Sequence, residues 1–290
     1  MVNTALILAG GLGKRLLPIT AAIPKEMLPV VDRPLLQFAA EEAVASGIRR
    51  IVFVTSPGKG IIRDYFSGRG SAIARLQAAG DDESLAIATG ASRLADFEFV
   101  EQPRPLGIAN AVACARQWLD EPAFALMFPD DLLFAKVPPL QQLIARHRTT
   151  GGGVIAVQSV PADEVANYGI VSINPASGGR LAGIVEKPEP AEAPSNLAVI
   201  GRYVLTRGIL DHIDRLQPGR GGEYQLTDAI ESQLQAGDPV HAVEIEAERF
   251  DTGRPGGYLV ALTAAALRRP DLGDALATIR RMLAQGAPTP

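Results

Sequence analysis

Residues 5–15, reading Ala-Leu-Ile-Leu-Ala-Gly-Gly-Leu-Gly-Lys-Arg, pass from a short apolar strand into a glycine-rich loop that ends on two cations. Glycine has no Cβ atom, so the N–H groups of such a loop can approach and converge on an anion. Lys14 and Arg15 supply positive charge at the loop, and Lys25 follows ten residues on. The stretch predicts a strand that opens into the phosphate site of a nucleoside triphosphate.

Two familiar glycine-rich loops do not fit this stretch. A dinucleotide-binding loop reads G-x-G-x-x-G, but Leu16 stands where the third glycine would follow Gly11 and Gly13, and no acidic residue closes a second strand about twenty residues on. A P-loop reads G-x-x-x-x-G-K-[ST], a string that the chain lacks. A nicotinamide-dependent oxidoreductase and a P-loop enzyme are therefore disfavoured.

Composition narrows the class of protein. The 290 residues carry a net charge of −4, so we expect no general attraction to nucleic acid. Cys114 is the only cysteine and there are three histidines, which argues against a disulfide and against a Cys- or His-based metal site. We see no signal peptide and no apolar run of the ~20 residues that span a membrane. We expect a cytoplasmic enzyme that does not bind membranes.

Apolar, β-rich segments alternate with helical patterns along most of the chain. This alternation is typical of an α/β protein with a mostly parallel sheet and helices on both faces. We expect one catalytic domain over 1–254, with a nucleotide-binding half (1–150) and an acceptor-binding half (151–254), followed by a helical segment over 255–290. The predicted strands include 5–9, 51–55, 97–100, 124–128 and 154–160, the predicted helices are 35–46, 61–66, 110–119, 138–147, 228–235, 258–268 and 273–283, and residues 68–95 are expected to form a helical segment followed by a loop.

The first motif and several later segments resemble those of a known enzyme family. Residues 9–34, AGGLGKRLLPITAAIPKEMLPVVDRP, resemble the signature of the sugar-1-phosphate nucleotidyltransferases, and 23–29 resemble the bacterial UTP–glucose-1-phosphate uridylyltransferases in particular. The resemblance implies a Rossmann-like three-layer sandwich with a mostly parallel mixed sheet. It also implies Mg²⁺-dependent transfer of a uridylyl group from UTP to α-D-glucose 1-phosphate, giving UDP-glucose and pyrophosphate. Further matching blocks, in the family's order, cover 102–112, 128–133, 168–171, 185–203, 222–230 and 250–253.

The cations suit nucleotidyl transfer, which depends on neutralising charge and aligning the reacting groups more than on a base. The planar guanidinium of Arg15 can grip phosphate oxygens and stabilise departing pyrophosphate. By resemblance, Arg15 and Lys25 are the family's catalytic basic pair, joined by Lys187 at the acceptor. The nucleotide-binding set that we predict is Ala9, Gly10, Gly11, Gly13, Lys14, Arg15, Lys25, Glu26, Gln102, Gly107 and Asp130.

Two carboxylates are predicted to hold magnesium. Asp130 follows the predicted strand 124–128. A carboxylate that faces a triphosphate from the end of a strand suits Mg²⁺, which prefers few carboxylates together with phosphate oxygens and water. Asp251, in the block Phe-Asp-Thr-Gly, resembles the family's second metal ligand. From the dipeptide alone, Asp130-Asp131 could also cap a turn.

Base recognition is predicted at Gln102 and Gly107. An amide side chain can donate and accept at once, which suits the O4 and N3–H edge of uracil or thymine, and glycine permits close approach of the backbone to the ring. Asn110 stands where the uridylyltransferases usually carry histidine, and Thr252 is commoner in thymidylyltransferase-like relatives. Transfer from dTTP, or to another sugar 1-phosphate, stays open as an alternative.

The acceptor site is predicted around Glu186 and Lys187. By resemblance, Lys187 binds the sugar 1-phosphate and Glu186 a pair of sugar hydroxyls, whereas a glutamate beside a lysine is otherwise most often a solvated ion pair. Trp118 is expected to pack in the core rather than to stack on the sugar. The full acceptor set that we predict is Asp131, Tyr168, Gly169, Glu186, Lys187, Gly201 and Glu223.

The C-terminal segment carries an apolar stripe at helical spacing, formed by Leu259, Leu262, Ala266 and Leu267. We expect the stripe to bury against another subunit in a homodimer or homotetramer, with packing on its own domain as the alternative. A non-catalytic sugar-nucleotide-binding regulatory protein is a further alternative from a different class. Its mark would be loss of the charged catalytic residues, all of which are present in the sequence.

Overall fold

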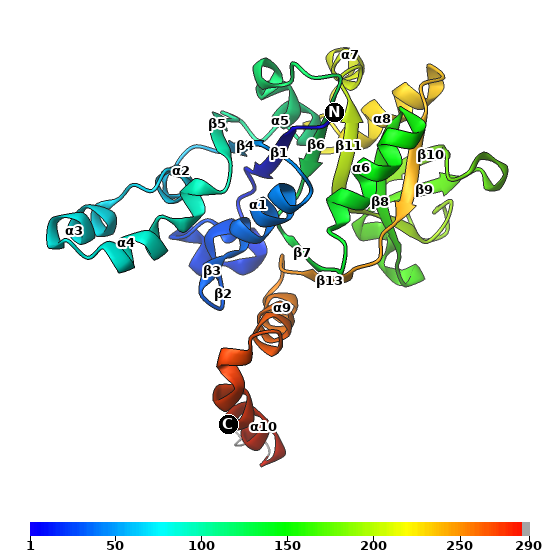
Figure 1. The fold of residues 1–290 in the computed structure, drawn as a ribbon. Helices are drawn as coiled ribbons and strands as arrows, with labels where there is room; N and C mark the ends of the chain where they lie inside the picture. The colour runs from blue at the N-terminus through cyan, green and yellow to red at the C-terminus, as the bar shows by residue number, and fades with distance from the viewer. Residues whose placement is uncertain (286–290) are drawn as a thin grey trace.

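The computed structural model describes residues 1–285, and a nine-stranded mixed sheet forms its centre (Figure 1). The strands lie in the order β10-β9-β11-β6-β1-β4-β5, with β8 paired to β11 and β12 paired to β8. Two further ladders, β2–β3 and β7–β13, lie outside the main sheet. The strands are β1 (Thr4–Ala9), β2 (Pro29–Val30), β3 (Arg33–Pro34), β4 (Arg50–Thr55), β5 (Asp96–Glu101), β6 (Ala123–Met127), β7 (Asp131–Phe134), β8 (Gly153–Ser159), β9 (Gly169–Ile173), β10 (Leu181–Glu186), β11 (Leu197–Thr206), β12 (Val240–Glu244) and β13 (Glu248–Asp251).

Parallel and antiparallel pairing divide the sheet. β1 lies between β4 and β6 and is parallel to both, and β5 continues the parallel run beyond β4. β11 runs antiparallel to β6 and to β8, and β9 runs antiparallel to β10. The α/β class and the mixed sheet predicted from the sequence are confirmed.

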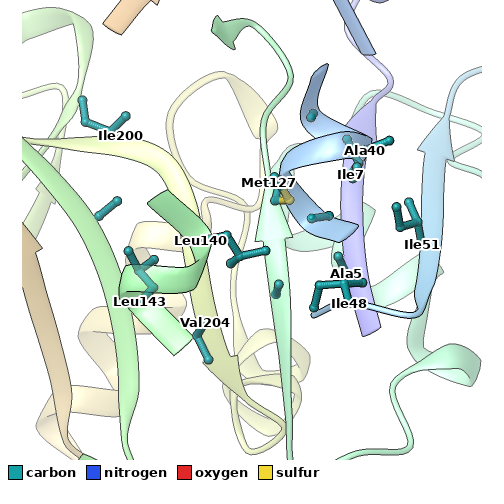
Figure 2. Close-up of a cluster of buried hydrophobic side chains, with 14 of the residues drawn as sticks. Ala5, Ile7, Ala40, Ile48, Ile51, Met127, Leu140, Leu143, Ile200 and Val204 are labelled. Atoms are coloured by element: carbon teal, nitrogen blue, oxygen red, sulfur yellow. The ribbon is translucent and has the colours of Figure 1, made fainter. Parts of the chain in front are cut away.

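Helices cover both faces of the sheet, which gives three layers (Figure 1). Successive side chains of a strand point to opposite faces, so Ile7 enters one apolar cluster and Leu6 the other. Figure 2 shows the first cluster, in which Leu140 and Leu143 of α6 pack over the strands near Met127. The helices are α1 (Leu35–Ala45), α2 (Gly60–Phe66), α3 (Ser71–Ala79), α4 (Asp82–Ala88), α5 (Ile108–Cys114), α6 (Pro139–Thr150), α7 (Ile209–Arg215), α8 (Leu226–Gln235), α9 (Pro255–Leu267) and α10 (Gly273–Ala284).

Residues 68–95 form two α-helices and a 3₁₀ turn over Gly90–Arg93, where a single helical segment and a loop were expected. Gly80 adopts the left-handed conformation (φ 65°) that ends α3, and Asp81 accepts the N–H of Ser84 to begin α4. These two local signals account for the break between the helices.

The helix expected over 110–119 is also shorter than predicted. α5 ends at Cys114, and a 3₁₀ turn over Arg116–Trp118 follows it. This turn leaves the next residue, Leu119, fully inside the second cluster. Trp118 packs against the same cluster, as expected.

The last two helices project from the body of the molecule (Figure 1). α9 uses Ala261 and Ala265 to pack on a third apolar cluster that includes Leu132. Leu259 and Leu267, on the predicted stripe, are 63% and 54% exposed. Within residues 1–285, none of the helices combines the length and apolar character that a bilayer crossing needs.

Candidate active site

Two cavities meet beyond the carboxyl ends of β1, β4 and β6, the edge at which open α/β sheets bind ligands. The glycine-loop cavity has a volume of about 290 Å³, and Gly10, Lys25 and Gln102 are among its lining residues. The Lys187 cavity has a volume of about 510 Å³ and lies beside β9, β10 and β11. Ile108, Phe128 and Asp130 line both cavities. Two ligands bound side by side would therefore meet at Asp130.

An ion pair stands at this junction. The Nζ atom of Lys25 donates to Oδ2 of Asp130 at 2.7 Å. Burial opposes the charge on both groups, but their mutual attraction outweighs it, which raises the pKa of Lys25 and lowers the pKa of Asp130. Both groups are therefore charged at neutral pH, with the ammonium held where the two cavities meet.

A short ladder brings the second predicted metal ligand to the same place. β13 pairs with β7 so that Asp251 lies opposite Asp131. The backbone N–H and the hydroxyl of Thr252 both donate to the carbonyl oxygen of Asp130, at 2.9 and 2.8 Å. Asp130 and Asp251 consequently line one cavity although they are far apart in the sequence.

This donor set fits magnesium. Mg²⁺ binds through one or two carboxylates and completes its shell with water and phosphate oxygens. Asp130 and Asp251 provide two carboxylates beside an open cavity. Among residues 1–285, no group of three or more His, Cys, Asp or Glu side chains forms a closed protein cage for a metal.

Lys187 lines the cavity named after it, and its backbone is strained. Its φ angle is 44°, in the left-handed region that residues with a Cβ atom rarely adopt. The N–H of Lys187 donates to the carbonyl of Tyr168 at 3.0 Å, and its Nζ atom lies 3.1 Å from the carboxylate of Glu186. Gly169 lines the same cavity. The structure thus brings these four predicted acceptor residues together.

Asp131 lines the Lys187 cavity, but both its carboxylate oxygens are engaged within the protein. Oδ1 accepts from Nε of Arg249 at 2.6 Å, and Oδ2 accepts from the N–H of Gly201 at 3.3 Å. The guanidinium of Arg249 also lies over the ring of Tyr168, 4.7 Å from its centroid. Arg249, which the sequence reading missed, shares the cavity wall. Arg249 directly precedes the block 250–253, but nothing in a single sequence indicates that such a neighbouring arginine contacts Asp131.

The Gln102 side-chain amide makes hydrogen bonds within the protein that the sequence did not predict. Its Nε2 atom donates to the carbonyl of Gly107 at 3.0 Å and to Oδ1 of Asn110 at 2.9 Å. Both N–H groups are used, so Gln102 offers a ligand its oxygen rather than a donor and an acceptor at once. Asn110, noted only as a departure from the family, holds this orientation.

Gly107 is required by the chain's own packing. Its φ angle is 96°, and a Cβ atom there would lie 2.5 Å from the carbonyl oxygen of Tyr224. The N–H of Ala109 donates to that oxygen at 3.1 Å. Glu223 lines the glycine-loop cavity and also a third cavity, of about 710 Å³, whose wall includes Glu186 and Lys187. Glu223 therefore lies beside two of the predicted acceptor residues as well as beside the glycine-loop cavity.

The remaining residues of the first motif lie at three different places. Gly13 adopts the left-handed conformation (φ 65°) before a 3₁₀ turn over Lys14–Leu16, which directs Arg15 to the Lys187 cavity. Lys14 is exposed and lines neither cavity in the described chain. Ala9 is buried at the end of β1.

A buried arginine supports the turn that carries Asp130. Arg202, on β11, is 1% exposed and donates to both carboxylate oxygens of Glu42 on α1, at 2.7 to 3.0 Å. It also donates to the carbonyls of Phe128 and Asp131, at 2.7 and 3.1 Å. Sequence reasoning missed this group because its partners come from two distant segments, α1 and residues 128–131.

Glu26 is fully buried, although it belongs to the predicted nucleotide-binding set. Its Oε2 atom lies 2.8 Å from Nζ of Lys59, and its buried Oε1 atom has no hydrogen-bond partner among the described residues. Glu26 is one of the residues that line the glycine-loop cavity. Lys59 was missed, although a lysine between two glycines four residues after a predicted strand is a signal that could have found it.

Comparisons with known proteins place the chain among enzymes. The model of the Nucleotidyl transferase family matches residues 4–266. A UTP–glucose-1-phosphate uridylyltransferase of Bacillus subtilis is 40% identical over 95% of this chain and 94% of its own length. A second, from Staphylococcus saprophyticus, is 42% identical over 92% of this chain and 93% of its own length.

Solved structures agree with the sequence relatives. The UTP-bound UGPase of Acinetobacter baumannii superposes with a TM-score of 0.86 at 36% identity, covering 98% of this chain and 100% of its own. A UDP-glucose pyrophosphorylase complexed with UDP-glucose gives a TM-score of 0.83 at 32% identity, covering 93% and 100%. The resemblance noted in the sequence is confirmed: the chain belongs to the nucleotidyl transferase family, as a relative of the bacterial UTP–glucose-1-phosphate uridylyltransferases.

Proposed function

We propose that the protein transfers the uridylyl group of UTP to α-D-glucose 1-phosphate with the help of Mg²⁺ and releases pyrophosphate. The observation that carries this proposal is the junction of two cavities at the Lys25–Asp130 ion pair. A nucleotide in one cavity and a sugar phosphate in the other would meet at a cation and a metal ligand. Relatives solved with UTP and with UDP-glucose support the choice of ligands.

The glycine-loop cavity suits a pyrimidine nucleotide. Oε1 of Gln102 can accept the N3–H of uracil, a group that thymine shares. The base edge alone does not separate UTP from dTTP, so an assay must compare them.

The reaction that we propose is a single in-line displacement. An oxygen of the sugar phosphate forms a bond to the α-phosphorus, and the bond from that phosphorus to the bridging oxygen of pyrophosphate breaks. Lys187 holds the attacking phosphate, Lys25 neutralises the α-phosphate, and Arg15 stabilises the leaving group. Magnesium on Asp130 and Asp251 would supply further charge neutralisation.

One assay tests the function. Pyrophosphate release should be fastest with UTP and glucose 1-phosphate when the enzyme is offered the four common ribonucleotides, dTTP and a panel of sugar 1-phosphates in buffer with magnesium. Faster release with dTTP would favour the thymidylyltransferase. Binding of UDP-glucose without turnover of any pair would favour the regulatory protein.

Lys187 and Arg15 should fail in different ways. Lys187→Ala removes the cation assigned to the acceptor, so it should chiefly raise KM for glucose 1-phosphate, with kcat/KM falling about ten- to a hundred-and-fifty-fold, the loss typical of a charge-assisted contact. Arg15→Ala should chiefly lower kcat, because charge on the leaving group grows only as the bond breaks. Steady-state kinetics with each substrate varied in turn measure both effects.

Lys136 offers a control for these variants, because it is exposed and lines neither cavity in the described chain. Lys136→Ala should leave kcat, KM for glucose 1-phosphate and kcat/KM unchanged. An unaltered KM for glucose 1-phosphate in Lys187→Ala, or an effect of Arg15→Ala on that KM alone, contradicts the assigned roles.

We also propose that residues 1–254 act as the catalytic domain and that the C-terminal helices join subunits into a homodimer or homotetramer. The exposed apolar residues Leu259, Leu267, Met282 and Leu283 support this proposal, since isolated helices seldom leave such a surface in water. Light scattering at micromolar concentration should give a multiple of the monomer mass, and Leu259→Asp/Leu267→Asp should give the monomer. A monomeric wild-type chain would refute the assembly.

A further inference from the structure

Lys59 contacts the glycine loop from outside the two cavities. Its Nζ atom donates to the carbonyl oxygens of Ala9 at 2.5 Å and Gly11 at 2.7 Å, and to Oε2 of Glu26 at 2.8 Å. An ammonium group has three N–H donors, and all three are used here. Lys59 therefore has no donor left for a substrate phosphate, unlike Lys25.

We propose that Lys59 is a positioning residue that sets the orientation of the glycine loop for phosphate binding. In a trans peptide the C=O of one residue and the N–H of the next point in opposite directions. The peptide bonds of this loop are trans. With the carbonyls of Ala9 and Gly11 drawn to one ammonium, the N–H groups of Gly10 and Leu12 point away from Lys59. Since Gly10 and Gly11 line the glycine-loop cavity, the loop presents donors rather than carbonyl oxygens to a phosphate.

The same ammonium connects the loop to the catalytic lysine. Glu26 follows Lys25 in one 3₁₀ turn, and the Lys59 and Glu26 side chains are only 9% and 1% exposed. Removing Lys59 would leave a buried carboxylate without its cation and two carbonyl oxygens without a donor. The loop would then be free to turn its carbonyl oxygens toward the negatively charged phosphates.

The expected defect concerns the phosphates and not the whole nucleotide. Lys59→Met keeps a side chain of similar length and removes only the ammonium. The affinity for UTP should fall about ten- to a hundredfold. The choice of UTP as the ligand rests on the proposed function. Binding of uridine, which has the base and the ribose but no phosphate, should stay close to that of the wild type, as should binding of glucose 1-phosphate.

Calorimetric titration of the full chain with UTP, uridine and glucose 1-phosphate, in buffer with magnesium, tests the proposal. The variants are Lys59→Met and the exposed control Lys136→Met, which should bind all three ligands as the wild type does. The titration measures binding and does not depend on turnover. If the wild-type protein showed no uridylyl transfer, the proposed function would be contradicted, but the comparison of UTP with uridine would still test the role of Lys59.

Two outcomes would overturn the positioning role. Wild-type affinity of Lys59→Met for UTP would show that the loop needs no such support. An equal loss of affinity for UTP and uridine would show that Lys59 merely maintains the cavity. If Lys59→Met does not fold, Lys59→Leu, which also lacks the donors to the two carbonyls, replaces it in the same comparison with the same criteria.

Discussion

Asp130→Asn should lower kcat about a hundred- to a thousandfold, the loss that follows removal of one preorganised charge at a reacting centre. The carboxylate is the partner of Lys25 and, in the proposed reaction, a ligand of magnesium, so one substitution affects two charges at the junction of the cavities. Asp251→Asn should act in the same direction. Pyrophosphate release at saturating substrates measures the effect, and excess chelator should abolish the wild-type activity.

Asp64 provides the matched control, because it is exposed on α2 and lines neither cavity in the described chain. Asp64→Asn should retain wild-type turnover, and circular dichroism should show that all three variants are folded at the assay temperature. Undiminished turnover in Asp130→Asn, or full wild-type activity in excess chelator, would contradict the assignment of a metal-dependent centre at this aspartate.

Arg202→Met should lower the free energy of unfolding by about 3–5 kcal/mol, because breaking a buried ion pair leaves an uncompensated charge. Glu42 would lose its cation, and the carbonyls of Phe128 and Asp131 would lose their donors. Glu42→Met should be comparably destabilising, and the double variant should be less destabilised than the sum of the two. Urea unfolding of the four proteins gives the cycle.

The exposed pair Arg116–Asp214 is the control for this cycle. Its side chains are 43% and 52% exposed, so Arg116→Met should change the free energy of unfolding by less than about 1 kcal/mol. A similarly small effect of Arg202→Met would show that Arg202 does not support the turn that carries Asp130.

Much of the fold follows from local patterns. The strand over 5–9 and the helix over 35–46 were predicted within one residue, because apolar periodicity, a proline before the helix and Gly47 after it act over a few residues. The β7–β13 ladder was not predicted. Its strands are short, and they pair across more than a hundred residues, so no local pattern marks the partner.

The candidate site divides in the same way. Motif residues such as Lys25, Asp130 and Lys187 are visible in the sequence because they occur in recognisable blocks. Arg202 and Arg249 are not, because their roles come from partners on other segments. The orientation of the Gln102 amide likewise depends on Asn110, a contact that only the folded chain reveals.

The left-handed backbone of Lys187 bears on selection for thermostability. A residue with a Cβ atom in this conformation loses roughly 1–2 kcal/mol relative to its relaxed state, and glycine is the residue that removes the strain. Lys187→Gly would release it but would also delete the ammonium assigned to the sugar phosphate. A screen for heat resistance alone would therefore enrich variants with a raised KM for glucose 1-phosphate, so a library of stabilised variants should hold Lys187 fixed.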